Sequence, residues 1–220
     1  MKESPIPFKG DMIRAVLSGQ KTQTRRPMKP IPVYPDAFDG LRREIHDGQV
    51  HFWASGAELP AHKFRCPYGQ PGDRLWVKET FYKYYPSETW PEPKALYKAD
   101  GITLCDKDSE GKKQRWTTSI HMPRILSRIT LEITDIRVER VQNITSDGAI
   151  ADGAYEVRKV GDDIAHATWT MDGLDWRYDT PREAFAATWD SLYAARGLGW
   201  DVNPWVWVIT FKRAEEVCPE

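Results

Sequence analysis

Residues 19–26, with the sequence GQKTQTRR, form the densest cluster of reactive side chains in this chain. Within a few positions they supply one amine, two hydroxyls and two guanidinium groups, from Lys21, Thr22, Thr24, Arg25 and Arg26. Such a group can bind an anion or activate a hydroxyl as a nucleophile. The same residues are also typical of a polar strand edge with solvated basic side chains. Because Lys21 and Thr24 are three positions apart, their side chains meet only if the chain turns between them.

Glu79 is a candidate carboxylate for the same chemistry. Strand alternation in RLWVKETF places it on the face of Leu75 and Val77, and a carboxylate on an apolar face is costly unless it is paired. Two explanations stay open. In the first, Glu79 has a structural role, at an open strand end or in an ion pair with an arginine such as Arg26 or Arg124. In the second, it belongs to a functional site.

Asp152 is a second candidate carboxylate. It stands directly before Gly153, where a short helix is expected to end. Its position fits a polar residue at a surface turn, and it equally fits a carboxylate directed into a cleft. The local pattern does not choose between the two.

Motifs of other chemistries are missing from the sequence. The five histidines have no metal-ligand spacing, and no GxSxG, HExxH, P-loop or GxGxxG is present. The three cysteines, Cys66, Cys105 and Cys218, are odd in number and lack CxxC spacing, which disfavours both a disulfide framework and structural zinc. We therefore expect no metal and no other cofactor.

Composition is that of an ordinary soluble protein, and the cysteine pattern favours a cytoplasmic location. Hydrophobic residues make up 40% and charged residues 29%, while 31 Lys and Arg nearly balance 32 Asp and Glu. Any contact with nucleic acid must therefore come from a local basic patch. The opening residues MKESPIPFKG lack an apolar signal core, and no stretch is long enough to span a bilayer. We expect no membrane association, and the sequence does not predict an oligomeric state.

Hydrophobic periodicity indicates both helices and strands. Helical spacing predicts one helix between Asp11 and Gly19, a short one capped by Thr145 or Ser146, and one that opens with a capping box at Thr180. The inner face of that last helix is expected to be Phe185, Trp189, Leu192 and Tyr193.

Alternation predicts three strands. They are RLWVKETF, then RILSRITLEIT, where Ile125, Ile129, Leu131 and Ile133 share one face, and finally NPWVWVITFK, where Trp205, Trp207, Ile209 and Phe211 do. A change of parity near Asp135 indicates a β-bulge. Together, the predicted helices and strands indicate an α+β fold with a small curved sheet or barrel.

Five segments, taken in order, resemble the ASCH domain of the PUA-like superfamily in the longer form found in phage and prophage proteins. They are SGQKTQTRR, GDRLWVKETF, MPRILSRITLEITDIRVERVQNIT, AIADG and NPWVWVITF. The pattern runs from near residue 8 to residue 212. It implies a single domain over residues 1–220: a small, mostly antiparallel β-barrel flanked by helices, with insertions at about 28–71, 83–120 and 154–179.

The resemblance also implies an activity, the hydrolysis of N4-acetylcytidine to cytidine and acetate. Compact relatives use a Lys and a Thr three residues apart together with a downstream Glu. The first two correspond to Lys21 and Thr24, and the A-x-D-G spacing puts the third at Asp152. That Asp is a departure from the family pattern, since its side chain is one methylene shorter.

On this reading Thr24 attacks the acyl carbonyl and Lys21 takes its proton. Asp152 orients Lys21 or protonates the leaving N4 amine, while Arg26 or backbone N–H groups hold the oxyanion. Desolvation and a cationic neighbour, Arg25 or Arg26, are expected to lower the pKa of the Lys21 amine. The substrate is an acylated pyrimidine nucleoside.

The remaining candidates are expected to bind the substrate, with Trp76 or Tyr82 stacking on the pyrimidine and Glu79 and Arg124 completing the site. The alternative is an RNA-binding module or weak ribonuclease, in which phosphate is contacted by Lys21, Arg25, Arg26 and Arg124. A third possibility is a barrel that serves only protein contacts.

Overall fold

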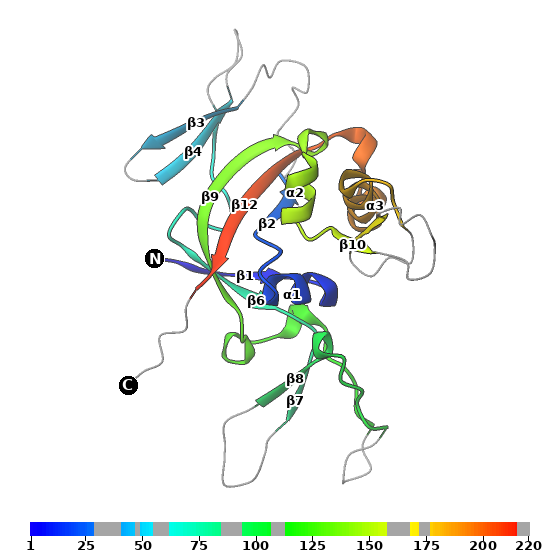
Figure 1. Ribbon diagram of the computed structural model, residues 1–220. Helices are drawn as coiled ribbons and strands as arrows, with labels where there is room; N and C mark the ends of the chain where they lie inside the picture. The colour runs from blue at the N-terminus through cyan, green and yellow to red at the C-terminus, as the bar shows by residue number, and fades with distance from the viewer. Residues whose placement is uncertain are drawn as a thin grey trace.

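The computed structural model describes residues 1–28, 41–46, 49–54, 62–84, 94–106, 113–157, 168–171 and 177–214. A five-stranded sheet lies at its centre, and the long curved strands β9 and β12 dominate the view in Figure 1. In spatial order its strands are β1 (Glu3–Pro7), β6 (Arg74–Lys78), β9 (Thr130–Arg140), β12 (Trp205–Arg213) and β2 (Gln23–Pro27). β1 and β6 are parallel, and the other neighbours are antiparallel.

The predicted α+β class is confirmed. Within the described part of the chain no strand pairing joins the edge strands β1 and β2, so the sheet is open rather than closed into a barrel. Six single-turn 3-10 helices connect the described elements. They are η1 (Lys98–Asp100), η2 (Ser119–His121), η3 (Arg124–Leu126), η4 (Val141–Asn143), η5 (Ala194–Arg196) and η6 (Trp200–Val202).

Smaller sheets occupy the three expected insertions. Their strands are β3 (Leu41–His46), β4 (Gln49–Ala54) and β5 (His62–Phe64) in the first, β7 (Phe81–Tyr84) and β8 (Lys94–Tyr97) in the second, and β10 (Tyr155–Val157) and β11 (Thr168–Thr170) in the third. The β3–β4 and β7–β8 hairpins project from opposite ends of the molecule (Figure 1).

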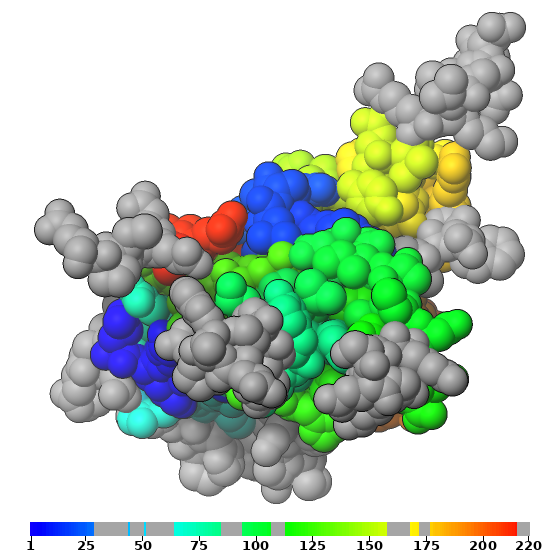
Figure 2. All heavy atoms as spheres, turned by 90° about the horizontal axis from the view of Figure 1, so that it is seen from below, coloured from blue at the N-terminus to red at the C-terminus, as the bar shows by residue number. Residues whose placement is uncertain are grey.

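Helix α1 (Gly10–Leu17) forms where the apolar spacing predicted it and buries Ile13 and Val16. Its N-cap is Lys9 and not Asp11, because the helix begins one residue before Asp11 and places that carboxylate in the first turn. The segment around η1 packs beside this helix, as the adjoining blue and green spheres in Figure 2 show.

Helix α2 (Ser146–Ala151) is short and well capped. The Thr145 hydroxyl accepts a hydrogen bond from the Gly148 N–H at 3.0 Å, which resolves the predicted choice of cap in favour of Thr145. Asp152 is the C-cap, and Gly153 follows with φ 113°. A positive φ costs glycine nothing, so the chain can turn sharply directly after Asp152.

Helix α3 (Pro181–Tyr193) begins with the predicted capping box. Thr180 and Glu183 exchange side-chain to backbone hydrogen bonds of 3.2 Å, and Pro181 occupies the first turn. The predicted inner face is confirmed, with Phe185, Trp189 and Tyr193 buried and Leu192 partly buried.

Strand β12 is buried on both faces. Trp207, Ile209 and Phe211 share the predicted face and pack into the core beneath α1. Val206 and Val208 point the other way, into a second core formed with α2 and α3. Because helices cover this second face, the strand reads as an almost continuous apolar run.

Two predicted strand boundaries are wrong. The first strand ends at Lys78, and β7 begins separately at Phe81, so Glu79 lies at a corner between two strands. The second strand starts at Thr130; Ile125 lies in η3 with 72% of its surface exposed. Ile125 therefore fits the alternating strand pattern in sequence although it lies in a 3-10 helix.

The predicted bulge near Asp135 is confirmed. Asp135 pairs with Thr210, whereas the next residue of β12, Phe211, pairs with Ile133. Thr134 is therefore an extra residue on β9, which brings apolar residues on both sides of it onto the buried face.

Candidate functional site

A buried ion pair joins the start of β2 to the end of α2. The Lys21 amine donates to the backbone carbonyl of Asp152 and, at 3.0 Å, to its Oδ1. The two side chains are 0% and 3% exposed. The main chain is fixed here by hydrogen bonds of 2.9 Å from Lys21 N to Ala15 O and from Thr22 N to Ala151 O.

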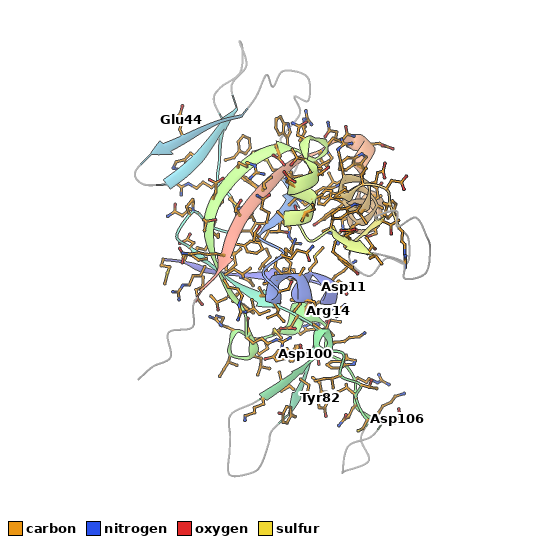
Figure 3. The ribbon with its side chains drawn as sticks, viewed as in Figure 1. Asp11, Arg14, Glu44, Tyr82, Asp100 and Asp106 are labelled. Carbon is orange, nitrogen blue, oxygen red and sulfur yellow. The ribbon has the colours of Figure 1, made fainter. Side chains whose placement is uncertain are left out.

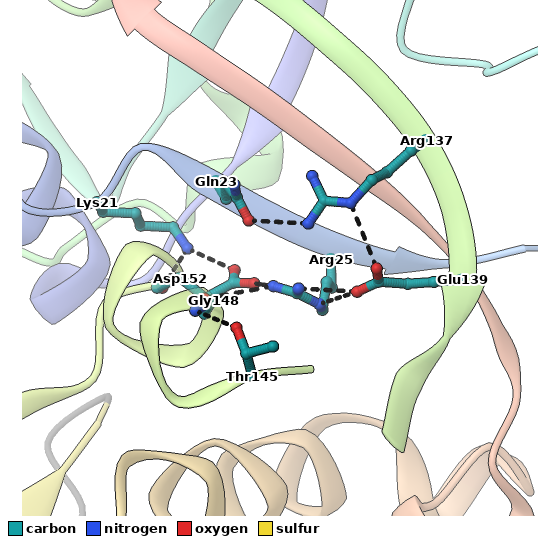
Figure 4. Close-up of polar contacts among 8 residues, drawn as sticks. All are labelled: Lys21, Gln23, Arg25, Arg137, Glu139, Thr145, Gly148 and Asp152. Carbon is teal, nitrogen blue, oxygen red and sulfur yellow. Dashed lines mark hydrogen bonds and ion pairs between the residues drawn. The ribbon is translucent and has the colours of Figure 1, made fainter. Parts of the chain in front are cut away.

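Arg25 reaches the same carboxylate from the opposite side (Figure 4). Its Nη1 donates to Asp152 Oδ2, while Nε and Nη2 donate to Glu139 Oε1 at 3.0 and 2.8 Å. Arg137 then donates to Glu139 Oε2 at 3.3 Å. The result is a line of alternating charges from Lys21 to Arg137, in which the carboxylate of Asp152 is shared by two cations.

These contacts set the protonation of the pair. Burial lowers the pKa of the Lys21 amine, and the charge of Asp152 partly opposes that effect. Burial alone would raise the pKa of Asp152, but the charges and hydrogen bonds of Lys21 and Arg25 outweigh it and hold that pKa below its usual value. Asp152 is therefore a stable carboxylate, and Lys21 loses its proton more readily than an exposed lysine does.

A cavity of about 280 Å³ opens beside this ion pair. Its lining includes Thr24, Arg25, Arg26 and Asp152, so the structure brings four of the predicted site residues together. Thr24 is 4% exposed. Lys21 is absent from this lining, although its amine contacts Asp152, and in the described residues no hydrogen bond joins it to the Thr24 hydroxyl.

Aromatic side chains form much of the cavity wall. Phe185, Trp189 and Tyr193 come from α3, and Phe8 comes from the segment between β1 and α1. The volume lies just below the roughly 300–1,000 Å³ typical of small-molecule sites. A flat ring the size of a pyrimidine suits such a wall.

Glu79 is buried elsewhere, with 2% of its surface exposed. Arg128 donates to both of its carboxylate oxygens, at 2.9 and 3.0 Å, and to Asp100 at 2.9 and 2.7 Å. The partner of Glu79 is therefore neither Arg26 nor Arg124. Burial raises the pKa of Glu79, and Arg128 opposes this.

Three further predicted binding residues also lie apart from the described lining of the cavity. Trp76 is part of the central sheet, where the Lys78 amine lies 5.3 Å from its ring centroid. Tyr82 belongs to β7, whose hairpin points away from α2 and α3 (Figure 3). Arg124 pairs with Glu3 at 3.0 Å. The order of the motifs along the chain does not reveal these positions.

Sequence reasoning missed several residues of the site. Arg137 and Glu139 are two positions apart on β9 and so share one face of the strand. Two charged residues on one strand face are the sequence pattern that could have indicated them. Trp189 and Tyr193 were expected only to fill the core, but they also face the cavity. Phe8 had no distinguishing pattern.

Comparisons of the chain with models of protein families, with curated proteins and with solved structures gave no match. None of the helices in the described ranges has the length and apolar character of a membrane-spanning segment. The described part of the chain also contains no group of three His, Cys, Asp or Glu side chains placed to hold a metal. The fold and site define an α+β protein with an aromatic cavity beside a buried Lys–Asp pair.

Proposed function

We propose that this chain is a cytoplasmic amidohydrolase of the ASCH type that cleaves N4-acetylcytidine, or a related N4-acylcytidine, to cytidine and the carboxylate. In this proposal the open five-stranded sheet corresponds to the barrel of the PUA-like superfamily. One observation carries it: Asp152 lines the same cavity as Thr24 and also holds the Lys21 amine at 3.0 Å. The shorter Asp side chain thus reaches the lysine that the family pattern pairs with a Glu.

The first step forms a bond between Thr24 Oγ and the acyl carbon. The hydroxyl proton passes to the neutral amine of Lys21, whose lowered pKa makes the neutral form accessible. This transfer needs a hydrogen bond from Thr24 to Lys21 that forms when the substrate is bound, since catalytic contacts often tighten only in the complex. Asp152 positions the amine.

The second step breaks the bond between the acyl carbon and N4. Arg26 lines the cavity beside Thr24 and can donate to the oxyanion. The Lys21 ammonium returns its proton to N4, which leaves as the amine of cytidine. Asp152 is ionised and so has no proton to give. Water then hydrolyses the acyl ester, releasing the carboxylate and restoring Thr24.

The base is held by aromatic side chains other than those expected. Phe8, Trp189 and Tyr193 line the cavity, whereas Trp76 and Tyr82 lie outside its described lining. Stacking on such rings contributes about 1–3 kcal/mol per base in nucleic-acid complexes. Stacking on these rings can therefore hold a pyrimidine in the cavity without a metal ion that binds its phosphate.

The alternative expectation, an RNA-binding module or weak ribonuclease, has less geometric support. Of the four basic residues expected to contact phosphate, Lys21 and Arg25 have side chains that are 0% and 1% exposed. Arg124 is paired with Glu3. Only Arg26 combines a cavity position with a charge that lacks a carboxylate partner in the described residues.

The test is to incubate the purified protein with N4-acetylcytidine and to follow cytidine by chromatography. Thr24→Val and Lys21→Met should each reduce kcat/KM by about 100-fold or more, while Thr24→Ser should keep part of the activity because it retains a hydroxyl. Matched controls are Thr103→Val and Lys212→Met, two exposed residues outside the cavity. No turnover by the wild type, or turnover undiminished in T24V and K21M, contradicts the proposal.

A further inference from the structure

Four cationic groups in the cavity lining and in the ion pair beside it are of two kinds. Lys21 and Arg25 are neutralised by the carboxylates of Asp152 and Glu139. Arg26 and Arg196 also belong to the site, and the described residues give neither of them a carboxylate partner. The lining therefore carries an excess of positive charge, which favours an anionic ligand.

Arg26 is held in place by apolar and backbone contacts. Its Nη2 donates to Pro7 O at 2.7 Å, and its guanidinium carbon lies 5.6 Å from the centroid of the Phe8 ring. Its Nε is buried and has no hydrogen-bond partner in the described part of the chain. It follows Thr24 by two positions in β2 and lines the same cavity, which suits the oxyanion of the proposed reaction.

Arg196 belongs to the exposed part of the cavity lining. Asp152 and Thr24, which are 2% and 4% exposed, belong to its buried part. Arg196 ends η5, is exposed, and follows the buried wall residue Tyr193 by less than one helical turn. An exposed residue in a cavity lining marks the mouth, and Lys9, which is also exposed, lines it as well.

The geometry of an acylcytidine fits this arrangement. In cytosine the N4 amine and the glycosidic N1 lie on opposite sides of the ring. When the acyl amide reaches Thr24 and the ring rests on the aromatic wall, the sugar must point to the mouth. A phosphate on that sugar would then be within the region of Arg196 and Lys9.

We propose that the preferred substrate is a phosphorylated N4-acylcytidine, which the protein favours over the free nucleoside, and that Arg196 binds its phosphate. This inference rests on the proposed function for the orientation of the base. A guanidinium binds phosphate through two parallel, charge-assisted hydrogen bonds. The phosphate can belong to a mononucleotide or to an RNA strand, which share this chemistry and are separated by experiment.

Binding tests the phosphate site without requiring catalysis. Wild-type protein is titrated with cytidine and with 5′-CMP at low salt by isothermal titration calorimetry. We expect 5′-CMP to bind at least about tenfold more tightly, a preference that falls toward one in Arg196→Met and is partly restored in Arg196→Lys. The matched control is Arg213→Met, an exposed arginine at the end of β12 outside the cavity, which should keep the preference.

Hydrolysis then separates the sources of the phosphate. The ratio of kcat/KM is measured for N4-acetylcytidine, its 5′-monophosphate and a short RNA containing one N4-acetylcytidine. A preference for the monophosphate alone identifies a mononucleotide substrate, whereas a preference for the RNA identifies a strand; both support the inference.

Other outcomes distinguish this inference from the proposed function. Hydrolysis with equal kcat/KM for nucleoside and phosphorylated substrates, together with equal binding of cytidine and 5′-CMP, overturns the phosphate site and leaves the amidohydrolase intact. Binding of 5′-CMP that depends on Arg196, without hydrolysis of any substrate, supports the site and overturns the activity. An equal loss of preference in R196M and R213M would show that overall charge, not Arg196, is responsible, and would overturn the assignment.

Discussion

Lys21 Nζ donates a hydrogen bond to Asp152 Oδ1 at 3.0 Å, and the two side chains are almost completely buried. Arg25 binds the other oxygen of the same carboxylate. Asp152 thus neutralises Lys21 and shares Arg25 with Glu139. Removing its carboxylate leaves the buried Lys21 amine without an anionic partner among the described residues and takes one of two carboxylates from Arg25, a change that is strongly destabilising.

Asp152→Asn should therefore lower the free energy of unfolding by roughly 3–5 kcal/mol, the range found when one member of a buried ion pair is lost. Urea denaturation followed by circular dichroism measures this change. The control is Asp147→Asn, an exposed residue in the first turn of α2, which should cost less than about 1 kcal/mol. Equal losses in the two variants would show that the buried carboxylate is not essential to the fold.

The stabilisation from Asp152 should also depend on pH. Its pKa in the folded protein lies below its usual value, so the folded state holds the carboxylate ionised where the unfolded state begins to protonate it. The contribution is complete above the unfolded pKa of about 3.9 and is lost as pH falls through the lower folded pKa. The difference in unfolding free energy between wild type and D152N should therefore be largest above pH ~4 and should shrink below it. A difference that grows in acid would contradict the sign.

Catalysis should follow the protonation of Lys21. Because burial lowers the pKa of this amine, the neutral base appears at lower pH than for a free lysine, whose pKa is about 10.4. The profile of kcat/KM for N4-acetylcytidine should thus rise to a plateau with a midpoint below that value. A midpoint at or above the ordinary lysine pKa would argue against Lys21 as the base.

Features that depend on neighbouring residues could be predicted from the sequence. The capping box of Thr180 and Glu183 and the bulge near Asp135 each follow from a few adjacent positions, and both are present. The partner of Glu79 could not be predicted in this way. Arg128 is 49 residues away in the sequence and meets Glu79 only after β6 and β9 have paired.

The same distinction between local patterns and contacts of distant residues applies to the candidate site. Local motifs singled out Thr24 and Asp152, which do meet at one cavity. They could not show that Arg25 forms ion pairs with two carboxylates, because Glu139 comes from a strand that is distant in the sequence. Nor could they show that α3 supplies the aromatic wall, since a helix residue that faces a cavity and one that faces the core have the same periodicity.

The contact between Arg128 and Glu79 leads to the last prediction. Glu79 has a side chain that is only 2% exposed, so Arg128→Met leaves a buried carboxylate without its partner. We expect R128M to lose roughly 2–4 kcal/mol of unfolding free energy at pH 7. The double variant Glu79→Gln with Arg128→Met should recover part of this loss, because it buries no uncompensated charge. Arg124→Met is the matched control: its ion pair with Glu3 is 43% and 37% exposed, and such pairs contribute about 0–1 kcal/mol.

The pH dependence of R128M checks the same argument. Burial raises the pKa of Glu79 already in the wild type, and removal of the arginine takes away the group that opposes this rise. A carboxyl with a raised folded pKa destabilises the protein as pH rises from the unfolded pKa, about 4.3 for glutamate, through the folded one. The loss in R128M relative to wild type should therefore be smaller at pH ~4 than at pH ~7, as measured by urea denaturation at both values. A loss that is independent of pH, or equal to that of R124M, would mean that Arg128 acts through packing alone.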